Sequence, residues 1–457
     1  MFLFGEGALC YTAGHERGCP MQRLLLIGAA ALAAVVPLRP SAATIVPNSV
    51  KFTPRYAVAD IAYELDTPAI VTMAIETNTL AHGAGEWLPV DGVHVQHVAG
   101  DVNRLVREAG TTRTIRWNAY ADLPGRRFLD GTIRAVITAW ATNAPPDWLV
   151  ADLTKEGDVR FYATTNDLPF GFSSDAYRLT HLLMRKIPAA GVTWMMGTPP
   201  SEHSLRNAER EIQHYVMLSE DYYMGVYEMT QGQCSNGVSA AYSDFFKDAP
   251  DALLRPRTNV GVAHLRGQTT EFGSGIWWPN TGHQVSDGSI IGTLRRKTGL
   301  QELDLPTAAQ WEYACRAGTT GAVNTGGSIT YAAWIYANSA QDTYNGARQT
   351  HVVGLKTPNA WLLYDMLGNV EEVCLDRGTF GDTYKATFTP GWEAGAVTVD
   401  PDGGMAGNPE YARGVVKLGG SWIEGDDMSR SGTHCYGGWD YAYNNIGFRL
   451  CLPARFH

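Results

Sequence analysis

The stretch NAWLLYDMLGNVEEVCLD, residues 359–376, decides the fold of the carboxy-terminal part of this chain. It places Asp365, Gly368 and Glu372 within eight residues of one another. From about residue 180 onward its surroundings are short apolar runs with many glycines and few helix signals. We therefore expect a loop-rich domain in which a few well-defined segments carry the fold.

The segment LPTAAQWEYACRAGT, residues 305–319, carries the clearest helix signal. The Thr307 hydroxyl can cap the helix, and Gln310 can reach back to the backbone N–H of the cap. Gly318 stands where a left-handed residue is wanted at the carboxy-terminal end. The side chains that we expect to pack inward are Trp311, Tyr313, Ala314 and Cys315.

Residues 60–78, 112–125 and 131–142 alternate apolar with polar or small side chains, between turn residues. A period of two marks strands with one buried face. Strands without intervening helices predict a small antiparallel β-sandwich of immunoglobulin or fibronectin kind. Trp117 and Trp140 are interpreted as its core, and residues 143–169 as its last strands and a linker.

The amino-terminal end resembles a secretory signal peptide. Arg23 is followed by an apolar run from Leu24 to Val36 and by small residues, and this run is short for a membrane span, although an anchor is the alternative. We expect the true start at Met21 and a secreted, periplasmic or cell-envelope location. The expected parts of the chain are the extension and signal peptide over 1–43, the sandwich over 44–168 and the loop-rich domain over 169–457.

The composition of the chain limits the classes of partner that it is expected to bind. The chain has 457 residues, of which 45% are hydrophobic and 18% charged, and its net charge is -10 without a basic block. Phosphate backbones require clustered Lys and Arg, so nucleic acid is a poor candidate partner. No later stretch reaches 18 consecutive apolar residues, so we expect no membrane span.

The cysteines that remain after the signal would meet an oxidising compartment, where pairing is the default and an odd thiol is left over. The sequence leaves their pairing open, and no CxxC or zinc-type Cys/His spacing occurs. The histidines are scattered, and we find no catalytic cluster. These cysteines are Cys234, Cys315, Cys374, Cys435 and Cys451.

Five segments, in order, resemble the formylglycine-generating enzyme family, also called sulfatase-modifying factor proteins. The resemblance spans roughly residues 180–452 and implies an irregular α+β fold similar to a C-type lectin domain. The segments are MGVYEMTQGQ (224–233), LPTAAQWEYACRAGT (305–319), YDMLGNVEEVCLD (364–376), LGGSW (418–422) and NNIGFRL (444–450).

The resemblance implies structural calcium. Carried over by position, Asp365 and Glu372 would give side-chain oxygens, and Gly368 and Val370 backbone carbonyls, which suit a hard cation. The alternative is that Asp365 caps a turn and Glu372 is solvated. A second family calcium would fall on a looser set, Asn338, the Ser339 carbonyl and Asp342.

The residues at the position where the family binds copper do not favour a copper site. Members that oxidise a sulfatase cysteine are similar in their GGS motif but carry two cysteines after it, and these thiolates hold monovalent copper. The corresponding residues are Glu424 and Ser429, and Cys435 lies six residues too late. A carboxylate and a hydroxyl cannot replace a pair of thiolates, so we expect no copper.

Two functions remain open. The first is a calcium-stabilised binding module for a peptide, protein or glycan; the second is an oxidoreductase of the formylglycine-generating type that uses an unrecognised metal site or Cys435. Residues clustered on the late loops would form an acidic, aromatic ligand site, although half of them could equally fill the core. They are Trp422, Glu424, Asp426, Asp427, Cys435, Tyr436, Trp439 and Tyr441.

The family places the ends of two segments in its core sheet. Cys374 and Cys451 end these segments, and we therefore predict a disulfide between them.

Overall fold

The described part of the chain belongs to one compact unit in a computed structural model. The segment predicted to be a signal peptide and Trp439 are not among the described residues. The described residues are 43–80, 85–126, 131–202, 211–238, 246–268, 283–343, 345–378, 396–401, 414–438 and 441–456.

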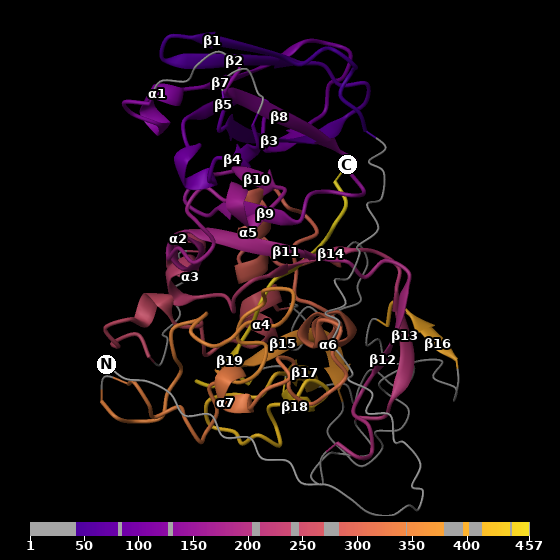
Figure 1. The fold of residues 1–457 in the computed structure, drawn as a ribbon. Coiled ribbons are helices and arrows are strands. Elements are labelled where there is room, and N and C mark those ends of the chain that lie inside the picture. Colours follow the sequence, from indigo (N-terminus) through magenta and orange to yellow (C-terminus); the bar gives the residue numbers. More distant parts are fainter. Residues whose placement is uncertain are drawn as a thin grey trace, which may run out of the picture. The chain divides into compact units, whose positions relative to one another are not determined.

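Two antiparallel sheets near the amino-terminal end share one core (Figure 1). Ile61 and Tyr63 from one sheet and Val71 and Ile75 from the other are fully buried there, as the alternation predicts. Trp117 lies in the same core. The immunoglobulin or fibronectin topology stays a prediction. The first sheet contains β1 (Lys51–Arg55), β2 (Val58–Tyr63), β7 (Arg113–Trp117) and β5 (Val98–Gly100); the second contains β4 (Trp87–Pro89), β3 (Ala69–Asn78), β6 (Arg104–Val106) and β8 (Ile133–Trp140), with β3 paired to the other three.

Residues 148–162, expected to complete the sandwich, instead extend the sheet of the following domain. Leu149 pairs with Met184, which also pairs with Gly225 on its other side. All residues of the strand that contains Leu149 are buried, which is typical of an inner strand and not of a sandwich edge. Trp140 likewise packs against the next core, and its indole N–H donates to Thr72 at 2.8 Å. The sheet order is β10 (Val159–Tyr162), β9 (Trp148–Asp152), β11 (His181–Ile187), β14 (Tyr222–Gly225) and β20 (Cys451–Pro453).

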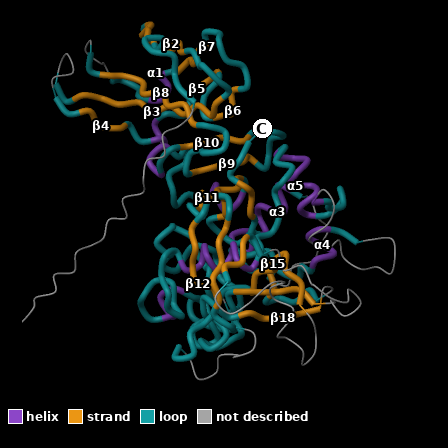
Figure 2. The backbone as a smooth tube through the Cα atoms, turned by 90° about the vertical axis from the view of Figure 1, so that its right-hand side faces the viewer, coloured by secondary structure: helices purple, strands orange, loops and turns teal. Residues whose placement is uncertain are grey.

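Figures 1 and 2 both show β10 and β9 between the amino-terminal strands and β11. Two further sheets complete the carboxy-terminal part. The first is β12 (Val192–Met196), β13 (His214–Leu218) and β16 (Val397–Val399). The second, which carries the candidate site, has the order β18 (His434–Gly438), β17 (Gly414–Leu418), β15 (Glu371–Gly378) and β19 (Ile446–Gly447).

The predicted helix is α6 (Ala308–Arg316), and its capping box is confirmed. Gln310 N–H donates to the Thr307 hydroxyl at 3.2 Å, and Thr307 N–H to the Gln310 side chain at 2.9 Å. The left-handed turn starts one residue earlier than expected, at Ala317 with φ +44°, and continues through Gly318. The side chains predicted to face inward are all buried.

The remaining helices of the described residues are short. None of them combines the length and hydropathy that crossing a bilayer requires. They are α1 (Ala119–Asp122), α2 (Ala176–Leu179), α3 (Gln231–Gly237), α4 (Val262–Arg266), α5 (Ile290–Thr298) and α7 (Ile329–Ala332), with single 3₁₀ turns η2 (Gly92–His94), η3 (Thr165–Asp167) and η4 (Ala252–Leu254).

Candidate functional site

A row of polar side chains crosses three neighbouring strands at the GGS turn. Lys417 on β17 stands directly opposite Cys435 on β18. Its ammonium group forms a buried ion pair with Glu371 on β15. Side chains of directly opposite residues lie on the same face of a sheet, so antiparallel pairing aligns the thiol with the ammonium. We call Glu371, Lys417, Ser421, Glu424 and Cys435 the carboxylate cluster.

Glu424 enters this cluster from the turn that follows β17. The Ser421 hydroxyl donates to Glu424 Oε2 at 3.0 Å, and Glu424 N–H donates to the Ser421 carbonyl at 3.1 Å. Burial, and next the carboxylate of Glu371, raise the pKa of Glu424 to about 7, while Lys417 opposes the shift. Glu424 thus carries a carboxyl group that titrates near neutral pH.

Cys435 is a buried free thiol inside the same cluster. Burial raises its pKa well above the ordinary value, and the carboxylates of Glu371 and Glu424 raise it further against the pull of Lys417. The thiol is therefore held protonated, which is the wrong state for a metal ligand or a nucleophile. The sequence placed Cys435 too late along the chain; strand pairing brings it beside Glu424.

Ser429, the second family cysteine position, is buried behind the turn. A Cβ on Gly420 would lie 2.2 Å from its hydroxyl oxygen, and Gly420 has φ +69°, so this close approach requires glycine. Within the described ranges, the Ser429 hydroxyl has no hydrogen-bond partner. Its observed role is packing of the turn.

The predicted ligand residues divide into packed and exposed groups. Trp422 is buried, its indole N–H donates to the Asn444 carbonyl at 3.1 Å, and its ring meets Phe246 edge-to-face. Asp427 and Tyr436 are half-buried, whereas Asp426 is exposed. Trp439 lies outside the described residues. Trp422 thus belongs to the core, as the alternative interpretation held.

Four exposed aromatic and aliphatic side chains belong to segments that adjoin the carboxylate cluster. Tyr441 is 42% exposed and contacts Tyr443, which is 54% exposed, with 5.4 Å between ring centroids. Ile423 and Tyr336 are also exposed. Tyr336 N–H donates to the Glu424 carbonyl at 2.8 Å, which ties it to the turn. We call these four residues the exposed rim; Ile423 and Tyr336 were not predicted.

The first predicted calcium set lies in a buried ionic region. Both carboxylate oxygens of Glu372 accept hydrogen bonds from Arg449, and one also accepts from Trp311. Asp365 Oδ2 accepts from Gly354 N–H at 2.6 Å, whereas Oδ1 is buried without a hydrogen-bond partner in the described part of the protein. Burial chiefly raises the pKa of Asp365 to about 6. Asp365 Oδ1 is the one oxygen of these two carboxylates that makes no hydrogen bond in the described residues.

Gly368 and Val370 belong to the tight turn between these carboxylates. The backbone of Gly368, with φ +74°, packs against Trp334, and a Cβ there would lie 2.4 Å from the Trp334 carbonyl. Val370 N–H donates to Glu228, a buried acid, at 3.1 Å. Arg449 already neutralises the charge of Glu372, so no further cation is needed to balance that carboxylate.

The second predicted calcium set is likewise engaged within the protein. Asn338 caps the backbone by accepting from Ile335 N–H at 2.8 Å. The Ser339 carbonyl lies 3.0 Å from His351 Nε2, and Asp342 is exposed. In the described residues no group of three His, Cys, Asp or Glu side chains is placed to hold a metal ion. Calcium binding at either set stays the prediction that the family resemblance implies.

Cys374 and Cys451 are both buried free thiols. Burial chiefly raises the pKa of each thiol, and Cys451 contributes to the shift of Cys374. The predicted disulfide is therefore not formed in the structure and remains a prediction for the oxidised protein.

Comparisons with known proteins place these residues in a family context. The domain described as "Sulfatase-modifying factor enzyme 1-like domain" matches residues 185–454. The chain is 31% identical over 164 residues to the formylglycine-generating enzyme of Streptomyces coelicolor, covering 33% of this chain and 46% of that protein. It is 23% identical over 192 residues to a protein of Paenibacillus barcinonensis named Chaperone protein LppX, covering 37% and 66%. The matches thus span about half and two thirds of these relatives.

Two solved structures are similar to the chain at low superposition scores. Treponema denticola variable protein 1 has 24% sequence identity and a TM-score of 0.42, and covers 60% of this chain and 96% of its own. PvdO from Pseudomonas aeruginosa has 23% identity and a TM-score of 0.42, and covers 60% and 94%.

Proposed function

Because the chain belongs to the sulfatase-modifying factor enzyme 1-like domain family, we propose that it is an exported binding module of this family and not a copper oxidase. One observation carries the proposal. At the turn where oxidising members hold copper with two thiolates, the carboxylate cluster offers two carboxylates, an ammonium group and a single protonated thiol.

The donor set does not fit monovalent copper. That ion prefers soft sulfur ligands, and Glu424 is a hard carboxylate already hydrogen-bonded to Ser421. Ser429 packs on Gly420, and the thiol of Cys435 is held in its protonated form by burial and by neighbouring carboxylates. No redox step is derived through this site.

The exposed rim supports binding through the same face. Clustered tyrosines give a large contact area with few rotatable bonds and a polar hydroxyl, which is why binding surfaces are enriched in them. Tyr441 lies close to Gly437, the neighbour of the carboxylate cluster on β18, and Tyr336 adjoins Glu424. A peptide, protein or glycan that presents hydrogen-bond donors beside an apolar group suits this combination.

Copper affinity tests the loss of oxidase chemistry. The full chain is titrated anaerobically with cuprous ion against a chromophoric chelator, and oxygen uptake is followed with a cysteine-containing peptide. The double variant Glu424→Cys, Ser429→Cys is the matched control, because it restores both thiols in the same turn. We expect the chelator to take the cuprous ion from the unmodified chain, whereas the double variant should retain it. Stoichiometric copper on the unmodified chain, with aldehyde formed on the peptide, would support the oxidoreductase instead.

Ligand arrays test the binding function. The full chain is applied to peptide and glycan arrays beside the double variant Tyr441→Ala, Tyr443→Ala. We expect selective binding that weakens at least about tenfold in the variant, because exposed aromatic anchors carry much of the energy of such interfaces. Tyr120→Ala serves as a control, since Tyr120 is an exposed tyrosine of the amino-terminal part. Equal binding by the chain and the rim variant would contradict the proposal.

A further inference from the structure

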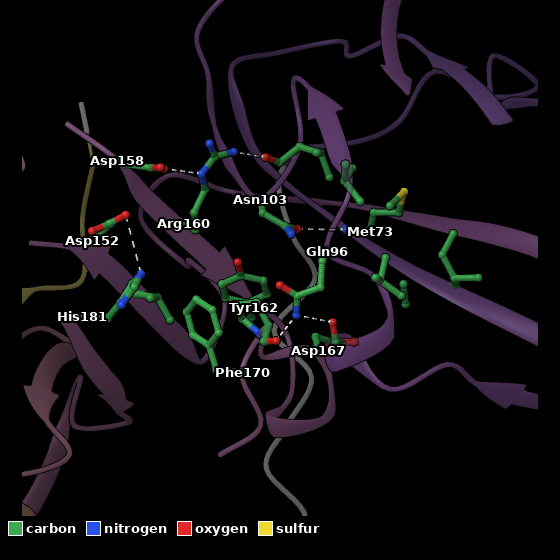
Figure 3. Close-up of a pocket in the computed structure, with 18 of the residues that line it drawn as sticks. Met73, Gln96, Asn103, Asp152, Asp158, Arg160, Tyr162, Asp167, Phe170 and His181 are labelled. Carbon is green, nitrogen blue, oxygen red and sulfur yellow. Dashed lines mark hydrogen bonds and ion pairs between the residues drawn. The ribbon is translucent and has the colours of Figure 1, made fainter. Parts of the chain in front are cut away.

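A pocket separate from the carboxylate cluster lies where the second amino-terminal sheet meets β9, β10 and β11 (Figure 3). Its cavity measures about 210 Å³. Met73 and Asn103 contribute from the amino-terminal side, and Asp152, Tyr162 and His181 from the three strands. All of its lining residues precede residue 185, where the family domain begins. The pocket is therefore formed by residues that precede the matched family domain.

Most charges in the pocket are already balanced by a neighbour. Arg160 lies 2.5 Å from Asp158, and Asp152 lies 3.2 Å from Lys155 and 3.7 Å from His181. The remaining carboxylate, Asp167, accepts hydrogen bonds from the backbone and hydroxyl of Thr164 in the cap of η3. An anion would meet no unpaired cation here. A cation would compete with Lys155 or Arg160 for Asp152 and Asp158, and with Thr164 for Asp167. The arrangement suits a ligand without net charge.

The pocket presents planar polar groups beside aromatic rings. Figure 3 shows Tyr162 and Phe170 near each other, with Gln96 and Asn103 on one side and the Asp152–His181 pair on the other. Burial raises the pKa of Tyr162, so its hydroxyl stays a neutral hydrogen-bonding group, and it is bonded to the Asn103 side chain. The ring of Phe170, 38% exposed, lies 4.7 Å from the imidazole of His181.

These groups match the chemistry of one sugar ring. Hydroxyl groups need donors and acceptors fixed in a plane, as carboxylate, amide and guanidinium groups are, and the C–H face of the ring packs on an aromatic side chain. A cavity of about 210 Å³ is smaller than the ~300–1,000 Å³ of drug-sized sites. We propose that this pocket binds a neutral polyhydroxylated ligand, one sugar ring of a glycan, between Phe170 and the polar groups of β9, β10 and β11.

The test uses the full chain and defined sugars. Glucose, galactose, mannose and N-acetylglucosamine are each measured by saturation-transfer difference NMR and by isothermal titration calorimetry. The variants are Phe170→Ala, which removes the exposed ring, and Tyr162→Phe, which removes one hydroxyl and keeps the ring. Phe170→Ala alters a partly exposed side chain, so it keeps the test valid if Tyr162→Phe fails to fold. Tyr120→Ala, at an exposed tyrosine that does not line the pocket, is the matched control. Tyr441→Ala is a separate variant that tests whether the sugar binds at the exposed rim instead.

Binding of at least one sugar, weakened tenfold or more by Phe170→Ala and by Tyr162→Phe but unchanged by Tyr120→Ala, is the expected result. The proposal is overturned if none of the four sugars binds, or if binding survives Phe170→Ala. Displacement of a bound sugar by inorganic phosphate would also overturn it, because the pocket would then select charge. The inference does not rest on the proposed function. If Tyr441→Ala were the only variant to lose sugar binding, the sugar would be assigned to the exposed rim and not to the pocket.

Discussion

Glu372 and Arg449 form a fully buried ion pair in which both carboxylate oxygens accept from the guanidinium group, at 2.6 to 2.9 Å. The pair joins β15 to the segment that follows β19. Arg449 also donates to the Gly225 carbonyl at 2.9 Å, and Trp311 of α6 donates to Glu372 at 2.6 Å. One ionic contact thus ties two sheets and the main helix together.

Removal of the Arg449 guanidinium group should strongly destabilise the folded protein. Arg449→Met leaves Glu372 buried without a counter-charge, and breaking such a pair costs about 3–5 kcal/mol. Urea unfolding at pH 7 measures the loss. Arg455→Met is the matched control near the same terminus, because its pairs with Glu220 and Glu302 are partly exposed and contribute about 0–1 kcal/mol. Similar losses in the two variants would contradict the interpretation.

Stability should depend on pH through Glu424. Its pKa rises from 4.5 to about 7 on folding, chiefly by burial. The folded protein therefore holds this proton more tightly than the unfolded chain, and the stabilising contribution present below pH 4.5 is lost as the pH rises to about 7. Glu424→Gln should remove this part of the dependence.

The measurement is the free energy of unfolding by urea at pH 5 and pH 8. We expect the unmodified chain to lose more stability between these values than Glu424→Gln does. Asp426→Asn, at an exposed neighbouring position, should stay within about 0.5 kcal/mol of the unmodified chain at both values. An unmodified chain that gains stability relative to Glu424→Gln on going to pH 8 has the opposite sign and would refute the assignment.

Cys435 should be unreactive in the folded protein. Burial and two carboxylates raise the pKa of its thiol, so little thiolate is present at pH 8. We expect iodoacetamide to label Cys435 at least about tenfold more slowly in the native chain than in urea, as read by peptide mass spectrometry. Glu424→Gln should speed the native reaction by removing one of the charges. Native labelling as fast as unfolded labelling would show that the thiol is activated, as an enzyme requires.

Calcium removal should leave the melting temperature within about 1 °C of its value in the presence of calcium. The oxygens of Glu372 and the carbonyl of Ser339 already take part in contacts within the protein. A structural calcium at 100 times its Kd would instead add about 2.7 kcal/mol, which corresponds to several degrees. Thermal unfolding in EGTA and in calcium compares the two cases. A calcium-dependent rise that Asp365→Asn abolishes would establish the site that the family resemblance implies.

Local signals allowed much of the fold to be predicted. The capping box of Thr307 and Gln310 needs only three residues of separation, and both hydrogen bonds are present. The alternation of Ile61 and Tyr63 likewise shows which face is buried. Gly318 has the left-handed conformation predicted for it, although the left-handed backbone begins one residue earlier, at Ala317. The partners of β9 were predicted incorrectly. Periodicity identifies a buried strand, but it does not say which sheet that strand joins.

The candidate site depended on contacts that spacing cannot show. Glu424 and Cys435 are eleven positions apart, and it is the register of β17 with β18, Lys417 opposite Cys435, that brings the thiol to the carboxylates. Lys417 and Glu371 were missed altogether, because a lone lysine and a lone acid on separate strands carry no sequence signal of their pairing.

By itself, the sequence determined the family segments, the capped helix and the replacement of two thiols by Glu424 and Ser429, because these are matters of residue type and short spacing. Only the tertiary structure decided which oxygens remain for a cation, which protonation state Cys435 holds, and where a pocket forms ahead of the family domain. The physical reason is that burial and charge pairing depend on neighbours from distant parts of the chain, and folding alone brings these together.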